Sequence, residues 1–394
     1  MSKHVKASTE KLSWIVPMRS RSPEEEHRAA TPLELFFDLV FVIAVAQAAS
    51  RLHHGIAEAH VAEAVISYMM VFFGIWWAWM NFTWFASAYD TDDVPYRLAV
   101  FVQITGALIL AAGVPRAFDE HDFTIATIGY VVMRLALVGQ WLRAARSDPA
   151  RRSTAYRFAI GVTACQIGWV ALLFFPTAWW GFPALVLAEL LVPIWAEQAE
   201  PTRWHPEHIT ERYGLFTIIV LGETVLSASL AIQSAIETSH LNANLVMIVI
   251  GGLLIVFSMW WLYFDQPGHT LLTSLRTAFV WGYSHLLIFA SAAAVGAGLA
   301  VTVDQAMDHG EIGAIAAGAA VAIPVAIYLI SLWALHWRPH TLKLSQTLLF
   351  PIAALLILLI PLTGQAVLGV GLLLAGLLVI KLTDRYRASA STGR

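Results

Sequence analysis

The sequence predicts an all-α polytopic membrane protein with about twelve transmembrane helices. Of its 394 residues 58% are hydrophobic and 13% are charged, whereas about a quarter of the residues in a soluble domain are charged. The mean hydropathy is +0.66. The apolar residues fall in about twelve runs of roughly twenty residues, the length that a helix needs to cross the hydrocarbon core of a bilayer. We therefore expect the lipid bilayer to be the main partner of the chain.

The expected spans follow one another as apolar runs separated by short polar or proline-containing loops. In order, they are Pro32–Leu52, Val61–Ser87, Tyr96–Val114, Phe123–Leu142, Tyr156–Phe175, Ala178–Ala196, Thr210–Gln233, Asn244–Phe264, Arg276–Val301, Ile312–Leu335, Leu344–Ile360 and Gly364–Leu382. We expect the two ends of the chain, residues 1–30 and 384–394, to be cytoplasmic tails. The first tail is expected to be disordered, because it mixes both charges without an apolar core.

Basic residues mark one side of the membrane. If the N-terminus is inside, the even-numbered loops carry the arginines and lysines, among them Arg97, Arg143, Arg151, Arg212, Arg276, Arg338 and Lys343, whereas the outer loops hold only Arg51 and Arg116. Basic residues near helix ends stay on the cytoplasmic side. The pattern predicts that both termini are cytoplasmic and that the number of spans is even.

Composition and motifs also exclude several classes of function. The formal net charge is −3, without a basic stripe, and this argues against nucleic-acid binding. The single cysteine, Cys165, permits no intrachain disulfide and no cysteine metal site. No phosphate loop, dinucleotide fingerprint or Ser-His-Asp arrangement is evident in the sequence, so we expect no cofactor and no metal. These absences favour a protein that is not an enzyme but leave the question open.

The spans predict two halves of six helices each, over residues 31–200 and 201–383. Glu34 and Glu211 begin the first span of each half, and the next span contains a tryptophan pair and ends near an aspartate. Arg97 and Arg276 then open the third span. Chance similarity between apolar helices is the alternative. A true repeat of this kind is parallel, about an axis along the membrane normal, as in transporter folds.

Three separated motifs resemble those of a known family. They are Thr31-Pro32-Leu33-Glu34-Leu35-Phe36-Phe37-Asp38, then Tyr89-Asp90-Thr91-Asp92-Asp93 with Arg97 beyond, then His208-Ile209-Thr210-Glu211-Arg212 running into Gly222-Glu223. In this order they resemble the bacterial low temperature requirement protein A family, from Thr31 to about Lys381. The resemblance implies a multi-pass protein of the bacterial cytoplasmic membrane that supports growth in the cold, and it implies no particular molecular activity.

Charged side chains inside the spans are the strongest functional candidates, because they are costly in lipid and usually face the interior of a helix bundle. Glu34 and Asp38 lie one turn apart, so their carboxylates repel unless they share a cation or one takes a proton. The alternative is a helix-start pair that is wetted at the surface and favoured by the helix dipole.

The seventh span carries His208, Glu211, Arg212 and Glu223 within an arc of roughly 120°. Glu223 lies about 16 Å further along the helix than Arg212, so surface water does not account for it. A proton relay or ligand site and a structural ion pair between helices are both open interpretations.

The remaining candidates are Asp90, Asp93 and Arg97 beside the third span, and Arg134 in the fourth. Either Asp92 or Asp93 caps the third helix, or the carboxylates of this segment hold Arg97. Arg134 lies near the middle of its span and must meet an anion, with Glu189 and Glu223 as candidates.

Three classes of function remain. A secondary carrier, with or without coupling to protons, fits a two-half design with buried carboxylates. It is the leading hypothesis, with an unknown small solute or proton as its ligand. An intramembrane enzyme that modifies lipids would use His208 and Glu211 as acid and base. A structural or sensory protein would use the same charges to hold helices together. In each case we expect the site in the cytoplasmic half, between the first and seventh helices.

Overall fold

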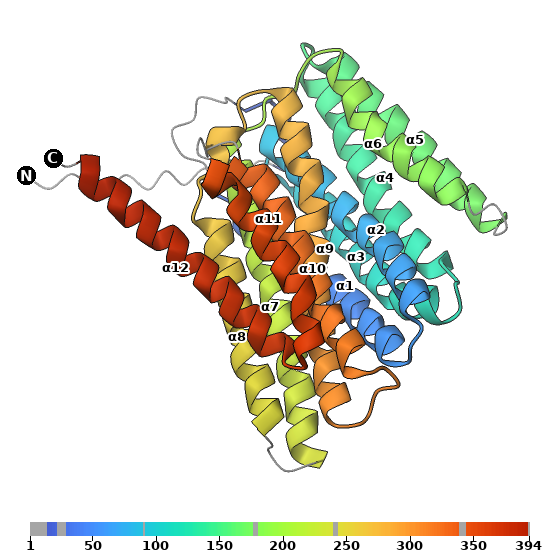
Figure 1. Cartoon of the computed structure of the whole chain (residues 1–394). Helices are drawn as coiled ribbons and strands as arrows, with labels where there is room; N and C mark the ends of the chain where they lie inside the picture. Colours follow the sequence, from blue (N-terminus) through green and yellow to red (C-terminus); the bar gives the residue numbers. More distant parts are fainter. Residues whose placement is uncertain are drawn as a thin grey trace, which may run out of the picture. The chain divides into compact units, whose positions relative to one another are not determined.

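The computed structural model describes residues 14–21, 29–89, 91–175, 180–238, 243–338 and 344–392. Within these residues the regular structure is helical, without strands, and Figure 1 shows its twelve α-helices. They are α1 (Pro32–Ala57), α2 (Val61–Tyr89), α3 (Val94–Asp119), α4 (Thr124–Ser147), α5 (Arg152–Leu173), α6 (Gly181–Glu197), α7 (Pro206–Thr238), α8 (Ala243–Phe264), α9 (Leu275–Ala306), α10 (Ala314–Leu332), α11 (Leu344–Leu359) and α12 (Ala366–Thr392). Short turns of other helix types are η1 (Gly268–Leu271), η2 (Trp333–Trp337) and η4 (Ile360–Thr363).

Ten helices in the described part of the chain are long and apolar enough to cross a membrane. The other two, α6 and α11, are shorter, with 17 and 16 residues. The prediction of an all-α polytopic membrane protein is therefore confirmed. Several helices continue past their predicted ends, such as α1 to Ala57 instead of Leu52 and α9 to Ala306 instead of Val301. Hydropathy detects only the part of a helix that lies in lipid, whereas backbone hydrogen bonding continues into the polar residues beyond it.

The chain forms two compact units, each assembled from separate stretches of sequence. One contains residues 84–106 and 131–205 together with the N-terminal segment, and the other contains residues 26–83, 107–130 and 206–394. The helices α2, α3 and α4 contribute residues to both. The predicted arrangement of two six-helix repeats stays a prediction.

In the second unit, α9 is the central helix. It packs against α1, α7, α8 and α10, and its residues from Ile288 to Val303 are buried. A helix that is buried on all sides needs small residues where its neighbours approach closely. At Gly298 an added Cβ would collide with the backbone of Ala320 in α10, and at Gly251 of α8 it would collide with the backbone of Val367 in α12. These glycines set the contact distance between the helix pairs.

In the first unit, α5 and α6 pack against each other, and the Trp141 ring of α4 stacks on Phe158 of α5 with centroids 4.1 Å apart. Residues 14–21, which lie within the predicted N-terminal tail, belong to this unit. The backbone N–H of Arg21 donates to the carbonyl of Ala88 at 3.1 Å, and Met18 is buried.

Candidate functional site

The first turn of α1 is closed by a capping box that also orients Glu34. The Thr31 hydroxyl oxygen accepts a hydrogen bond from the Glu34 backbone N–H at 3.3 Å, and the Thr31 backbone N–H donates to Glu34 Oε2 at 2.8 Å. This reciprocal pair satisfies two backbone donors that a helix start leaves without partners, and Pro32 follows at a position where no N–H is needed. One carboxylate oxygen of Glu34 is thereby used locally, and Oε1 faces α7.

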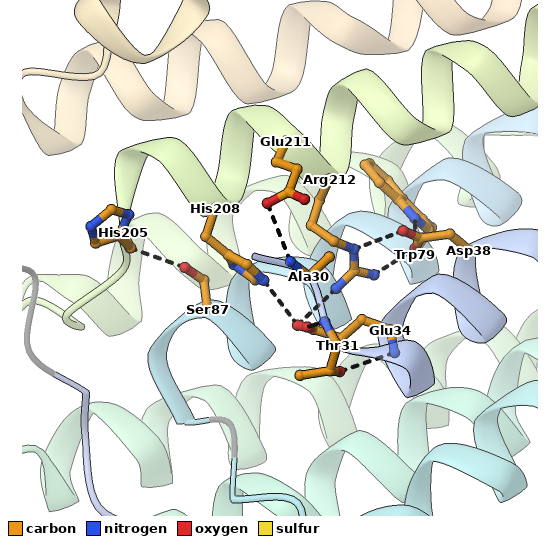
Figure 2. Close-up of polar contacts among 10 residues, drawn as sticks. All are labelled: Ala30, Thr31, Glu34, Asp38, Trp79, Ser87, His205, His208, Glu211 and Arg212. Atoms are coloured by element: carbon orange, nitrogen blue, oxygen red, sulfur yellow. Dashed lines mark hydrogen bonds and ion pairs between the residues drawn. The ribbon is translucent and has the colours of Figure 1, made fainter. Parts of the chain in front are cut away.

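Arg212 of α7 binds both carboxylates of α1 (Figure 2). Its Nε donates to Asp38 Oδ2 at 2.7 Å and its Nη2 donates to Asp38 Oδ1 at 2.5 Å, which makes the pair bidentate. Its Nη1 donates to Glu34 Oε1 at 3.0 Å. All three residues have 0% of their surface exposed. The two acids that repulsion would separate are held together by one shared cation.

Two further side chains complete this cluster. Trp79 of α2 donates its indole N–H to Asp38 Oδ1 at 2.7 Å, and His208 Nε2 lies 3.1 Å from Glu34 Oε1. His208 is also fully buried. We call Glu34, Asp38, His208 and Arg212 the α1/α7 cluster. Its formal charge is −1 when His208 is neutral and zero when His208 is protonated, so one proton decides whether its four side chains balance.

Glu211 lies beside this cluster but faces away from it. Its Oε2 accepts a hydrogen bond from the Ala30 backbone N–H at 3.2 Å, which ties the segment before α1 to α7. The residue is exposed, unlike its neighbours His208 and Arg212. Helical periodicity explains the difference, since residues 208 and 212 share a face and residue 211 is turned by about 100° from residue 212.

The charge balance of the α1/α7 cluster depends on a single proton. Each buried charge costs several kcal/mol of desolvation, and the cost is offset when the charge has close partners of opposite sign. Gain or loss of one proton changes that balance in a site without exposed surface. The chemistry of such a site allows it to hold a proton or a small cation.

Glu223 lies further along α7 and takes no part in this cluster. It is buried, and Ser227 Oγ donates to its Oε1 at 2.9 Å. Among the residues that the structure describes, no basic side chain lies within ion-pair distance of it. Glu223 is therefore a second buried carboxylate on the same helix, with a hydroxyl for its partner.

Arg134 meets an anion, as its depth in the membrane requires, and the anion is Glu189. Arg134 Nη2 donates to Glu189 Oε2 at 2.8 Å, between α4 and α6. The other oxygen, Oε1, accepts hydrogen bonds from Gln166 at 3.0 Å and Trp169 at 3.2 Å, both on α5. We call these the Arg134/Glu189 cluster. One cation, one anion and two neutral donors join three helices of the first unit.

The acidic segment before α3 separates into two contacts. Asp93 Oδ1 accepts from the Tyr96 backbone N–H at 3.0 Å and so caps α3, and both of its oxygens accept from Arg143 of α4. Burial would raise the pKa of Asp93, but hydrogen bonds from Arg143 and from the backbone N–H groups of Val16 and Tyr96 outweigh it and lower the pKa. Arg97 instead binds Asp92 on the surface, at 2.7 and 2.9 Å. Asp90 lies outside the described residues.

Sequence reasoning did not assign two residues that contact the α1/α7 cluster. Trp79 lies in an apolar run, where most tryptophans only pack, yet a buried indole N–H also needs an acceptor, and that requirement is the available signal. Thr31 was used only as part of a family motif. Its spacing to Glu34, a threonine followed three residues later by a glutamate, is the signature of a capping box.

Comparison with known proteins covers nearly the whole chain. A family model described as "Bacterial low temperature requirement A protein" matches residues 29–382. An uncharacterized protein of Rhizobium meliloti (strain 1021) is 29% identical over 289 residues, which cover 67% of this chain and 67% of that protein. The range matched by the family model contains every residue of the α1/α7 cluster.

Proposed function

This chain belongs to the bacterial low temperature requirement A protein family, and we propose that it is a secondary carrier of the bacterial cytoplasmic membrane that supports growth in the cold. The transported ligand is a small solute, and its movement is coupled to a proton or a small cation. The α1/α7 cluster is the coupling site, with Glu34, Asp38 and His208 as proton or cation ligands and Arg212 as the counter-charge.

One observation carries this proposal: within the described residues, the guanidinium of Arg212 binds two fully buried carboxylates, and a histidine stands at 3.1 Å from one of them. A buried set of charges with a titratable neighbour is what a proton-coupled element needs, because binding or release of the proton biases two arrangements of the helices.

Glu223 is proposed as a second proton or cation site on α7. It is a buried carboxylate partnered by the hydroxyl of Ser227, and a lone carboxylate in a membrane helix is neutral, or else charged with a bound cation. The other candidates have a simpler role. In the described part of the chain, Arg134 pairs with Glu189, Asp93 with Arg143 and Arg97 with Asp92. We assign these residues to holding helices in place.

The orientation follows from the charged loops, and we propose that both termini are cytoplasmic. Labelling of introduced cysteines tests this, because the native Cys165 is buried and gives a low background. The reagent is one that cannot cross the membrane. A cysteine in place of Ser153, at the start of α5, is expected to react with it only after the membrane has been made permeable. A cysteine in place of Glu120, beyond α3, is expected to react from outside. The reverse pattern would overturn the orientation.

Reconstitution into liposomes that contain a pH-sensitive dye tests the carrier. We expect the native chain to give proton flux that depends on a solute or cation from a broad panel. Asp38→Asn keeps the size of the side chain and removes its charge, and we expect at least about a tenfold loss of flux. The matched control is Asp119→Asn, an exposed carboxylate paired with Arg51, which should keep native flux. Native flux in a folded Asp38→Asn protein, or no flux from the native chain over the whole panel, would overturn the proposal.

Cold growth separates the carrier from a structural role. We expect Asp38→Asn to fail to restore growth of a deletion strain at low temperature while its protein level stays close to native. A structural role predicts the opposite combination, in which growth is lost only because the protein no longer accumulates.

A further inference from the structure

A cleft in the second unit lies next to the α1/α7 cluster but is not part of it. Its volume is about 500 Å³, and its walls come from the first turns of α7, the end of α8, the turn η1, the start of α9 and the turn η2. Glu211 of α7 lines it, although His208 and Arg212, on the other face of the same helix, do not. The cleft is large enough for a small organic ligand.

Aromatic rings form the inner wall. The Trp281 ring of α9 is parallel to the His336 ring, with an interplanar angle of 4° and centroids 6.1 Å apart, and the Tyr263 ring of α8 lies 5.2 Å from His336. All three side chains are buried, and Phe264 adds a fourth, partly exposed ring. Because packing holds these rings, the wall exists before any ligand binds.

His336 reaches the cleft through an irregular part of the backbone. It lies in η2, a π-helical segment that follows the last residue of α10. A π-helical turn is less favourable than an α-helical one and is often found where a side chain is redirected for function. Here it places His336 among rings from α8 and α9.

The outer rim of the cleft is acidic. Glu207 and Glu211, one turn apart on α7, both line it and are exposed. None of the described residues that line it is lysine or arginine. Exposed carboxylates at the rim and aromatic side chains inside favour a ligand with a positive charge and an apolar surface.

Trp281 supplies a second, independent sign of a ligand. Its indole N–H is buried and finds no acceptor within the described residues. A buried donor without an acceptor is unfavourable, and an oxygen atom of a bound molecule would supply the missing acceptor.

We infer that this cleft binds a methylated ammonium ion of the choline type. The ring faces of Trp281, Tyr263 and Phe264 would contact the methylated cation, Glu207 and Glu211 would complement its charge, and the indole N–H of Trp281 would donate to its oxygen. Free choline and the headgroup of phosphatidylcholine share this chemistry. The inference names the solute class of the proposed carrier and rests on that function for transport, but binding itself is measured without transport.

The test is a calorimetric titration of the purified full-length chain, in uncharged detergent, with choline and with 3,3-dimethyl-1-butanol, its neutral analogue of the same shape. We expect choline to bind at least about tenfold more tightly, because only choline carries the charge. Equal affinity for the two compounds, or no choline binding, would overturn the inference.

Variants locate the site. Trp281→Leu is expected to weaken choline binding at least about tenfold, whereas Trp261→Leu, which replaces an exposed tryptophan of α8 outside the cleft, should leave it unchanged. Trp281 is buried and its loss can disturb folding, so Glu207→Gln at the exposed rim is the second variant, with an expected loss of about threefold. Native affinity in both Trp281→Leu and Glu207→Gln would contradict the assignment.

Two further measurements distinguish free choline from the lipid headgroup as the ligand, and choline binding from transport. Nanodiscs of phosphatidylcholine should compete with free choline if the headgroup is the ligand, and nanodiscs of phosphatidylglycerol should not. Asp119→Asn, which changes an exposed carboxylate outside the cleft, should bind choline as the native chain does. Choline binding without flux would remove the carrier and keep the site, whereas flux of another solute without choline binding would remove the site and keep the carrier.

Discussion

The α1/α7 cluster and the Arg134/Glu189 cluster use similar parts in different proportions. In both, an arginine and a carboxylate meet between helices without exposed surface, and a tryptophan indole N–H donates to the carboxylate. In the Arg134/Glu189 cluster one cation meets one anion, and neutral donors satisfy the second carboxylate oxygen. In the α1/α7 cluster one cation meets two anions, and the additional neighbour is a histidine.

The two clusters therefore differ in the ratio of their charges and not in their burial. A balanced pair needs no proton, and we assign it to holding helices at one distance. Under the proposed function, a proton on His208 or on a carboxylate balances the α1/α7 cluster, so the stability of that cluster depends on a species that can leave.

Removal of a cation should harm the unbalanced cluster most. Arg212→Met leaves two buried carboxylates 0% exposed, and we expect a loss of at least about 3–5 kcal/mol in folding stability, the range for breaking a buried pair. Arg134→Met leaves one carboxylate that keeps two neutral donors, and its loss should be smaller. Thermal unfolding in detergent and protein level in the membrane measure both. Equal losses would mean that charge ratio is irrelevant here.

Removal of a whole pair should separate function from packing. Arg134→Met combined with Glu189→Leu replaces a buried pair with apolar side chains, which is often neutral or stabilising by about 1–4 kcal/mol, and flux should stay native. Arg212→Met combined with Asp38→Leu and Glu34→Leu should fold and lose flux. If the Arg134/Glu189 replacement abolishes flux while the protein still folds, the assignment of this cluster to packing alone is wrong.

His208→Gln should change the pH dependence of the proton flux more than it changes the maximal flux. Glutamine keeps a polar group near Glu34 but does not titrate between about pH 5 and 8, the range in which histidine usually changes charge. We expect a pH-dependent flux for the native chain and a flatter profile for the variant, measured in liposomes over that range. The same change at His285, a buried histidine of α9 bonded to Tyr263, serves as the control, and an identical flattening there would remove the special role of His208.

The smallest effect should come from the capped start of α3. The Asp93 pKa is lowered in the folded chain, so its contribution to stability is complete above its unfolded pKa of about 3.9 and is lost as the pH falls through the lower folded value. The difference in melting temperature between native and Asp93→Asn protein should therefore be present at neutral pH and disappear under acid conditions. Asp92→Asn breaks an exposed pair with Arg97 and should change stability by less than about 1 kcal/mol. A pH-independent difference for Asp93→Asn would contradict this account.

Much of the fold was predictable because it depends on local properties of the chain. The apolar runs place the helices, since backbone groups in lipid must bond within their own segment. Helix ends were less predictable, as α9 shows, because the last turns of a helix lie in polar sequence. The two compact units were not predictable, since residues 26–83 and 206–394 come together only through packing.

For the candidate site, the helical periodicity of the sequence predicted which charged residues share a helix face. It did not predict which residues they bind. Glu34 with Asp38 and His208 with Arg212 were recognisable as polar stripes on two helices. That Arg212 binds both acids, and that Glu223 stays apart with Ser227, depends on how far α7 is shifted along α1. Sequence spacing within one helix carries no information about that shift.

The sequence alone determined that this chain is a helical membrane protein with costly charges at particular depths, because hydrophobicity and the helical repeat are properties of neighbouring residues. Only the tertiary structure decided that one guanidinium serves two carboxylates in the α1/α7 cluster while Glu189 has a guanidinium of its own. The physical reason is that a charge in a low-dielectric interior interacts strongly with its nearest partners, and those partners come from helices that are distant in the sequence.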